Sequence, residues 1–341
     1  MVALKIVAAA ATLAAAASAL PSSFRPTTRQ VQYYNTLVTR QEQGAADQKL
    51  TDDKIANFAL TLEHLELAFY DDGLQRFGGQ MDEKTKALVK KIRDTEEAHV
   101  IKLQSTIAPL GVKPVESCKY NFAAVTDLAS MLKIGSMFED LGVSAYLGAA
   151  PAVQDKKVLA LAASIVTVES RHASLVNQAQ NLDPVAKPFD VALSPQAVFS
   201  MAKPFIASCP EGSNLPFEPF PALQPEGAQA QEAATASEAG ATLKFKAEGG
   251  AEEKATQCAF TAGTDVAPSN ALYAPYSKAE GCRVPGGVSG TTFAFLMKEA
   301  VPDSSIKDEN IVAGPMGMVF NKSGVPAAEG APAAEGAQGE R

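Results

Sequence analysis

Apolar residues recur with helical spacing through residues 51–180 of the chain. They return every three or four positions, which places them on one face of an α-helix. The pattern is interrupted at residues 73–82, 109–120 and 148–155. Residues 51–183 are therefore predicted to form a bundle of four helices.

Two of the predicted helices carry a carboxylate and an imidazole within this apolar face. The second helix holds Glu96 and His99, and the fourth holds Glu169 and His172. In both helices the motif Glu-x-x-His begins four residues after an isoleucine of the apolar face, so both side chains are expected to point inward. The neighbouring Glu97 falls on a different face and is interpreted as an ordinary solvated charge.

The first and third predicted helices resemble each other. Residues 62–70 align without a gap to residues 138–146. The alignment pairs two glutamates and, seven residues later, two tyrosines: Glu63 with Glu139, and Tyr70 with Tyr146. The bundle is therefore interpreted as an internal duplication of one helix pair. The two tyrosines are candidates for hydrogen bonds to the ligands, and ordinary core tyrosines are an equally good interpretation.

Four glutamates in one core require compensating charge, because a buried unpaired carboxylate costs several kcal/mol. Two divalent cations would balance Glu63, Glu96, Glu139 and Glu169. A donor set of carboxylate oxygen and neutral imidazole, without thiolate, suits Fe or Mn. The alternative is a metal-free bundle in which the Glu and His side chains are hydrogen-bonded to one another.

The choice of ligand on the first helix stays open between two glutamates. Glu63 and Glu66 both face the apolar side, and Gly142 stands where a duplicate of Glu66 would be. Glu63 is preferred from the alignment, with Glu66 as an alternative or additional ligand. His64 lies on another face and is expected to be structural or exposed.

These helices resemble the ferritin-like superfamily, and more closely the secreted ferritin-like proteins among fungal stress-response and plant desiccation-related proteins. The resemblance covers roughly residues 50–210 and rests on residues 62–70, 96–99, 138–148 and 168–173. It implies an all-α ferritin-like four-helix bundle with two Fe or Mn ions, and Glu96 and Glu169 as bridging carboxylates. The metal ligands that it implies are Glu63, Glu96, His99, Glu139, Glu169 and His172.

The first 19 residues are typical of a secretory signal peptide, with Lys5, an apolar run and a small-x-small cleavage site. Secretion into an oxidising compartment favours disulfides among the four cysteines. The preferred pairs are Cys118–Cys209 and Cys258–Cys282, because each pair lies within one predicted domain. Free buried thiols are the alternative.

The remaining chain is divided by its composition. Short β-type runs between Gly and Pro turns predict a small all-β sandwich-like domain, which has no histidine and no recognisable catalytic set. The predicted segments are a signal peptide (1–19), an N-terminal arm (20–50), the bundle (51–183), a Pro-rich segment wrapping it (184–222), a linker (223–241), the β domain (242–324) and a disordered tail (325–341). A sequon at Asn321 is a weak glycosylation candidate.

The net charge of −8 argues against nucleic acid as a partner, because such binding depends on Lys and Arg. The leading hypothesis is a secreted ferritin-like protein that holds two Fe or Mn ions and takes part in a stress response. Whether it is an enzyme stays open; if it is one, it is a di-iron or di-manganese oxidoreductase that acts on O2 or peroxide. The competing hypothesis is a non-enzymatic extracellular or cell-wall stress protein that uses the bundle as a scaffold. No transmembrane segment is expected in the mature chain, and association with a cell wall or surface fits the two-part architecture.

Overall fold

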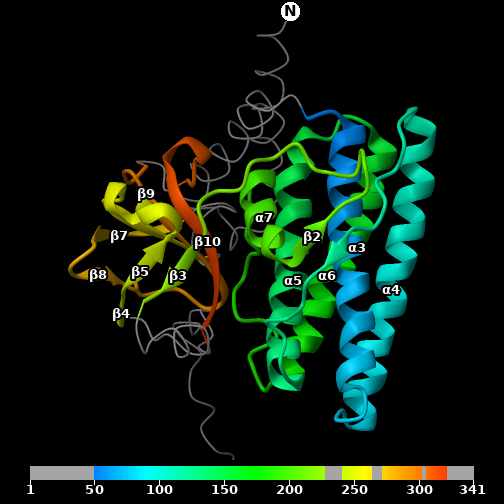
Figure 1. Ribbon diagram of the computed structural model, residues 1–341, viewed down its shortest axis with the longest axis horizontal. Coiled ribbons are helices and arrows are strands. Elements are labelled where there is room, and N and C mark those ends of the chain that lie inside the picture. Colours follow the sequence, from blue (N-terminus) through cyan, green and yellow to red (C-terminus); the bar gives the residue numbers. More distant parts are fainter. Residues whose placement is uncertain (1–49, 227–239, 263–270, 302–304, 321–341) are drawn as a thin grey trace, which may run out of the picture. The chain divides into compact units, whose positions relative to one another are not determined.

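The computed structural model describes residues 50–226, 240–262, 271–301 and 305–320 (Figure 1). Five predicted features lie wholly or largely outside these residues: the signal peptide, the N-terminal arm, most of the linker, the sequon and the C-terminal tail. Within the described residues, no helix is both long and apolar enough to cross a membrane.

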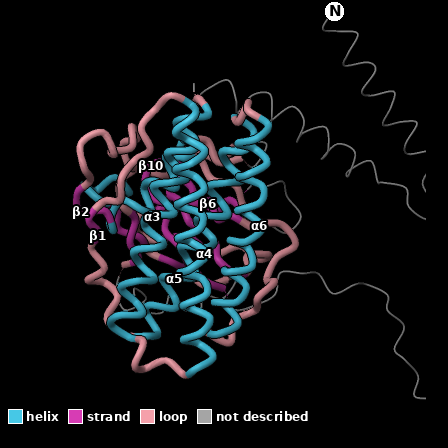
Figure 2. Tube along the Cα trace, turned by 90° about the vertical axis from the view of Figure 1, so that its right-hand side faces the viewer, coloured by secondary structure: helices cyan, strands magenta, loops and turns pink. Residues whose placement is uncertain are grey.

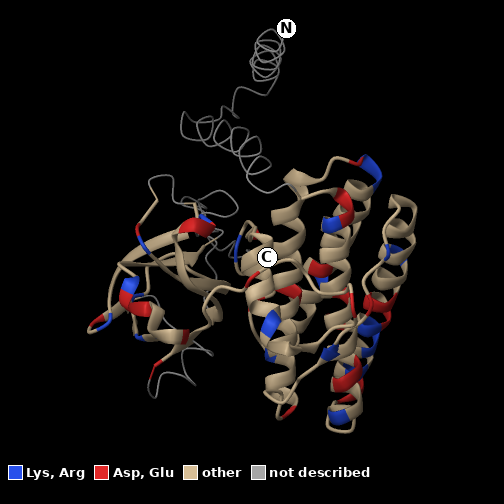
Figure 3. Ribbon diagram, turned by 45° about the horizontal axis from the view of Figure 1, so that its top comes forward, with Lys and Arg blue, Asp and Glu red and all other residues tan. Residues whose placement is uncertain are grey.

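Four long helices lie alongside one another, as predicted (Figures 1 and 2). They are α3 (Asp52–Phe77), α4 (Glu83–Ile107), α5 (Leu128–Ala149) and α6 (Lys156–Ala179). Aspartate side chains at Asp82, Asp127 and Asp155 accept hydrogen bonds from the first backbone N–H groups of α4, α5 and α6. Figure 3 shows acidic and basic positions interspersed along the helices.

Two predicted interruptions differ from the structure. Helix α3 continues past Gly73 to Phe77. Gly73 serves packing rather than a turn, because a Cβ atom there would lie 2.4 Å from the terminal methyl group of Met131 in α5. The connection between α4 and α5 runs over residues 108–127 and is longer than the predicted break at 109–120. It therefore has ample length to cross from one end of the bundle to the other.

Helices α3 and α5 are antiparallel. Ile55 near the start of α3 packs with Ala149 at the end of α5, whereas Met131 near the start of α5 contacts Gly73 near the end of α3. The two helix pairs are thus related by an approximate two-fold rotation. This arrangement brings the matched glutamates to the same level of the bundle.

The C-terminal region forms antiparallel strands, which confirms the predicted β region. Six strands form a curled sheet in the order β10-β9-β6-β7-β8-β4. Their bounds are β4 (Thr242–Leu243), β6 (Gln257–Thr261), β7 (Ala271–Ser277), β8 (Gly281–Arg283), β9 (Gly290–Met297) and β10 (Ile311–Phe320). A separate pair, β3 (Leu223–Pro225) with β5 (Phe245–Ala247), shares a core with this sheet. Residues 223–225 of the predicted linker are therefore a strand.

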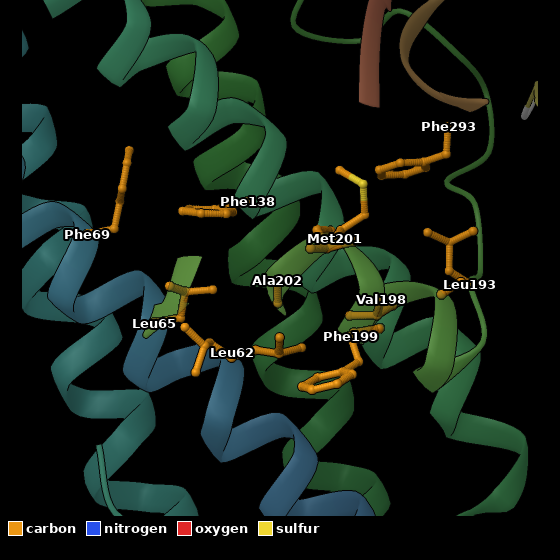
Figure 4. Close-up of a cluster of buried hydrophobic side chains, with 14 of the residues drawn as sticks. Leu62, Leu65, Phe69, Phe138, Leu193, Val198, Phe199, Met201, Ala202 and Phe293 are labelled. Carbon is orange, nitrogen blue, oxygen red and sulfur yellow. The ribbon is translucent and has the colours of Figure 1, made fainter. Parts of the chain in front are cut away.

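Strand β9 is buried on both of its faces. Ala294 and Leu296 belong to the core that the sheet shares with β3 and β5. Phe293 and Phe295 belong to a second core, which includes Leu193 and Met201 (Figure 4). One apolar core thus continues from the sheet through the Pro-rich segment into the helices.

The Pro-rich segment contains one short helix, α7 (Pro195–Ala202), and the strand β2 (Ile206–Ser208), which pairs with β1 (Lys119–Tyr120). Both expected disulfides are present. Cys118–Cys209 joins the α4–α5 connection to the Pro-rich segment, and Cys258–Cys282 joins β6 to β8.

Candidate metal centre

The six predicted ligands meet in the interior of the bundle. The carboxylates of Glu63, Glu96, Glu139 and Glu169 are at most 1% exposed, and both imidazoles are also buried. Potential ligand atoms form two overlapping groups, within each of which all atoms lie within 4.8 Å of one another. The groups are Glu63, Glu96, His99 and Glu169, and then Glu96, Glu139, Glu169 and His172. Glu96 and Glu169 are common to both groups.

His99 projects from α4 into the first group. Its Nδ1 lies 2.9 Å from Glu96 Oε2 one turn away on the same helix. The same nitrogen lies 3.1 Å from Glu63 Oε2 and 3.1 Å from Glu169 Oε1. Three carboxylates from three helices therefore surround one nitrogen.

His172 occupies the matching place in the second half. Its Nδ1 lies 2.8 Å from Glu96 Oε1 and 3.2 Å from Glu139 Oε2. The two imidazole rings lie 6.3 Å apart between centroids. His172 thus contacts one glutamate of its own half and one of the other half, whereas His99 contacts two of its own half and one of the other.

The two tyrosines hold the glutamates across the approximate two-fold axis. Tyr70 of α3 donates a hydrogen bond to Glu139 Oε1 of α5. Tyr146 of α5 donates to Glu63 Oε1 of α3, at 2.5 Å. Each helix therefore positions the glutamate of its partner, which sequence spacing alone does not show.

Glu66 also reaches the interior. It is buried, and a Cβ atom on Gly142 would lie 3.1 Å from Glu66 Oε1 and 3.3 Å from Glu169 Oε2. The absence of a side chain at Gly142 thus leaves room for Glu66 beside Glu169. Glu63 belongs to the first ligand group, and Glu66 stands at the edge of the cluster as an additional carboxylate.

His64 lies apart from the cluster. It is buried, with its Nε2 3.3 Å from the carbonyl oxygen of Val115 in the α4–α5 connection. Of the two roles expected for His64, the structural one is correct. Glu97 is exposed and forms an ion pair with Arg93.

Asp140, next to Glu139, is a half-buried residue that the sequence pattern did not single out, and its Oδ2 atom is buried. Burial raises its pKa, and its Oδ2 atom has no hydrogen-bond partner. Lys187 of the Pro-rich segment lies near enough to oppose that shift, while its Nζ donates to Thr291 O at 2.6 Å. The two residues are 47 positions apart, so no local pattern signals their proximity.

Burial dominates the electrostatics of most of the glutamates. It raises the pKa of Glu63 to about 8, and it also raises the pKa values of Glu139, Glu169 and Glu66. Glu96 is the exception. Burial opposes its ionisation, but hydrogen bonds from His172 and His99 outweigh that effect and lower its pKa to about 2.

The pKa values of the two histidines are raised, whereas burial alone lowers the pKa of an imidazole. Burial lowers the pKa of each, yet carboxylates outweigh it and raise the pKa of His99 to about 12 and that of His172 to about 9. Protons on the two imidazoles therefore supply the positive charge that the carboxylates attract.

Protons do not satisfy the whole cluster. Among the described residues, Glu169 Oε2 is a buried oxygen with no hydrogen-bond partner and no ion pair. Glu96 Oε1 and Glu169 Oε1 form no well-aligned hydrogen bond either, and each faces only an imidazole nitrogen that other carboxylates share, His172 Nδ1 at 2.8 Å and His99 Nδ1 at 3.1 Å. Glu96 and Glu169 are the residues shared by both ligand groups. Buried acceptors without a donor of their own are rare in native proteins and indicate a bound ion or water. The donor set, which has more carboxylate oxygens than imidazole protons, thus fits divalent cations.

Residues 51–182 match the family model of the ferritin-like domain. The helical part of the chain is therefore a ferritin-like domain, followed by the antiparallel strands. No curated protein matches the chain. This chain is similar to the solved structure of a conserved hypothetical protein from Mycobacterium tuberculosis, with 15% sequence identity and a TM-score of 0.35. The match covers 38% of this chain and 96% of the Mycobacterium tuberculosis chain.

Proposed function

We propose that the ferritin-like domain binds two Fe or Mn ions and that the secreted protein uses them in redox chemistry with O2 or peroxide, as part of a stress response. The observation that carries this proposal is the sharing of Glu96 and Glu169 by two overlapping ligand groups, in which Glu169 Oε2 has no partner and the imidazole nitrogens are each shared among several carboxylates. Glu63 and His99 would complete one site, and Glu139 and His172 the other.

If Fe or Mn ions are bound, they would supply one-electron redox chemistry to the site. The residues of the chain orient the candidate ligands and keep water away from them. Tyr146 and Tyr70 orient Glu63 and Glu139 by hydrogen bonds, so that their second oxygens stay directed at His99 and His172. Burial of the cluster excludes bulk water and strengthens every electrostatic interaction within it.

Binding of the ions requires the imidazoles to lose their protons. His99 Nδ1 and His172 Nδ1 face the carboxylates directly, so a proton and a cation compete for the same place. Loading is therefore expected to release protons, with an affinity that increases as pH rises. Secretion is supported by the signal-peptide pattern and is consistent with the two disulfides.

Metal analysis after anaerobic loading tests the proposal. The full chain is loaded with Fe(II) or Mn(II), desalted and analysed for metal, and about two ions per chain are expected. His99→Ala and His172→Ala are expected to lose most of the metal. His64→Ala is the matched control, because it removes a buried imidazole from the same bundle outside the cluster.

A native protein that takes up neither ion, or a His64→Ala variant that loses as much metal as His99→Ala, would contradict the proposal. The loaded protein is then assayed for consumption of O2 and of hydrogen peroxide. Metal binding without turnover of either would favour the alternative, a non-enzymatic extracellular or cell-wall protein in which the bundle is a scaffold.

A further inference from the structure

One end of the bundle contains a small, partly open pocket. It lies where α3 and α6 begin and α4 and α5 end, and all four helices contribute to its wall. The volume of the cavity is about 20 Å³. A cavity needs on the order of 10–15 Å³ to hold one water molecule, so the pocket admits only a molecule of about that size.

The wall of this pocket is apolar. Only two of its side chains carry a polar atom, those of Thr106 and Tyr146. Both hydroxyl protons are already used, because Thr106 donates to Lys102 O at 2.9 Å and Tyr146 donates to Glu63 Oε1 at 2.5 Å. Six of the other lining residues are alanines: Ala56, Ala59, Ala145, Ala149, Ala150 and Ala162.

The size and the polarity of the pocket together select its occupant. A buried water molecule needs two to four polar partners, and apolar cavities that lack them stay dry and take up apolar molecules or noble gases. Hydrogen peroxide carries two O–H donors, so this wall disfavours it for the same reason. Dioxygen is a small apolar diatomic molecule that needs no hydrogen-bond partner, so it fits both the volume and the wall.

Tyr146 connects the pocket to the candidate metal centre. The residue lines the pocket, and its hydroxyl donates to Glu63 Oε1. Glu63 Oε2 in turn lies 3.1 Å from Nδ1 of His99. An occupant of the pocket is therefore separated from a predicted metal ligand by one side chain.

We infer that this pocket is a docking site for dioxygen beside the candidate metal centre. The inference rests on the proposed function and deepens it, because it selects dioxygen over peroxide as the oxidant of the same centre. Uptake of dioxygen requires only the apolar wall, so it is measurable in the full metal-free chain.

Paramagnetic relaxation by dissolved dioxygen tests the inference. Dioxygen is paramagnetic and accelerates the relaxation of the methyl protons that it approaches. Alanine methyl groups are labelled, and NMR spectra of the metal-free chain are compared under dioxygen and under argon. Ala56 and Ala149 of the pocket have matched controls in Ala197 of α7 and Ala274 of β7, because the exposed fractions agree at 2% and 6%. We expect a several-fold greater enhancement at Ala56 and Ala149.

A variant that fills the pocket should abolish this difference. In Ala162→Leu, the methyl groups of Ala56 and Ala149 should relax no faster than their controls. Ala163→Leu is the matched control variant, because the same change falls on the adjacent, exposed position of α6, which does not line the pocket. If Ala162→Leu does not fold, Ala59→Val, which adds two methyl groups in place of one to the same wall, takes its place.

The choice of oxidant is measured with the Fe(II)-loaded protein. Oxidation of Fe(II) by dioxygen and by hydrogen peroxide is followed by absorbance after rapid mixing. We expect Ala162→Leu to lower the ratio of the dioxygen rate to the peroxide rate several-fold. Ala163→Leu should keep the native ratio.

Three results would overturn the inference: equal enhancement at the pocket and control methyl groups of the native chain, the same enhancement in Ala162→Leu as in Ala163→Leu, or a native rate ratio in Ala162→Leu. Enhancement at the pocket in a chain that takes up no metal would contradict the proposed function alone. Metal uptake without enhancement at the pocket would contradict the docking site alone.

Discussion

The two ends of the bundle are built from matched helices but are filled differently. Around Tyr70, the rings of Phe69, Phe122 and Phe138 lie edge to face and close the interior. Around Tyr146, Ala145 stands at the position of Phe69 and Leu62 at that of Phe138, and a small apolar pocket remains. Between the ends, the Glu, Glu-x-x-His and Tyr residues of the two halves are the same.

This difference shows which parts of a duplicated fold can diverge. A change in the size of an apolar side chain costs a moderate amount and can be absorbed by repacking. Loss of one partner in a buried cluster of charges leaves the others uncompensated, which is far more costly. The centre therefore stays matched, while the apolar packing at the two ends differs.

Truncation of side chains at the two ends is expected to have the largest effect on stability. Phe69→Ala should cost about 3–5 kcal/mol, because it creates a cavity in a closed core. Leu161→Ala should cost less, about 1–2 kcal/mol, because Leu161 is half-buried and borders existing space. Urea unfolding of the metal-free protein measures both.

The denaturant slope serves as the control for this comparison. A slope that is unchanged from the native protein shows that both variants unfold from equally compact states. If Leu161→Ala cost as much as Phe69→Ala, the pocket end would be as closely packed as the other end, and the contrast would fail.

The pH dependence of stability is expected to separate the metal-free and loaded centres. In the folded chain the pKa of Glu63 is raised to about 8 by burial, and that of His172 to about 9 by Glu139 and Glu96 despite burial. The folded state then holds more protons than the unfolded state, so stability is lost as pH rises from about 4.5 to about 9.

Unfolding of the metal-free chain at about pH 5 and about pH 8.5 measures this effect. Mn(II) should reverse the trend, since fewer protons then compete with the ion. Glu63→Gln should reduce the slope in the metal-free protein. A metal-free chain that is more stable at the higher pH would contradict the assignment of protons to the cluster.

The smallest expected effect on stability comes from the two tyrosines, and it should be equal in the two halves of the bundle. Tyr70→Phe and Tyr146→Phe each remove one hydrogen bond to a buried glutamate and should each cost about 1–2 kcal/mol. Urea unfolding at one pH compares them. Costs that differ by more than about 2 kcal/mol would show that the two halves of the centre are not equivalent.

The helices and the inward residues of the centre were predictable because each depends on local spacing. Glu-x-x-His places Glu96 and His99 on one face, and the repeat in the fourth helix does the same. The cross-bonding of Tyr70 to Glu139 was not predictable, since it depends on the antiparallel arrangement of α3 and α5.

The pocket and the continuous core could not be predicted from the sequence either, because both depend on contacts between residues far apart in the chain. Space at Ala145 exists only because no side chain from another helix fills it, and single-helix periodicity does not report that. Phe293 and Phe295 join the core of the helices through the Pro-rich segment, a contact between residues far apart in the chain. The burial of His64 likewise depends on Val115 in a connection.

The most direct test of the central claim is a crystal structure of the Mn(II)- or Fe(II)-loaded protein, with anomalous scattering recorded at the edge of the loaded metal. The account predicts two anomalous peaks, both within coordination distance of Glu96 and Glu169, one beside His99 and the other beside His172. The absence of a peak at this position, or a single ion that contacts neither shared glutamate, would contradict it.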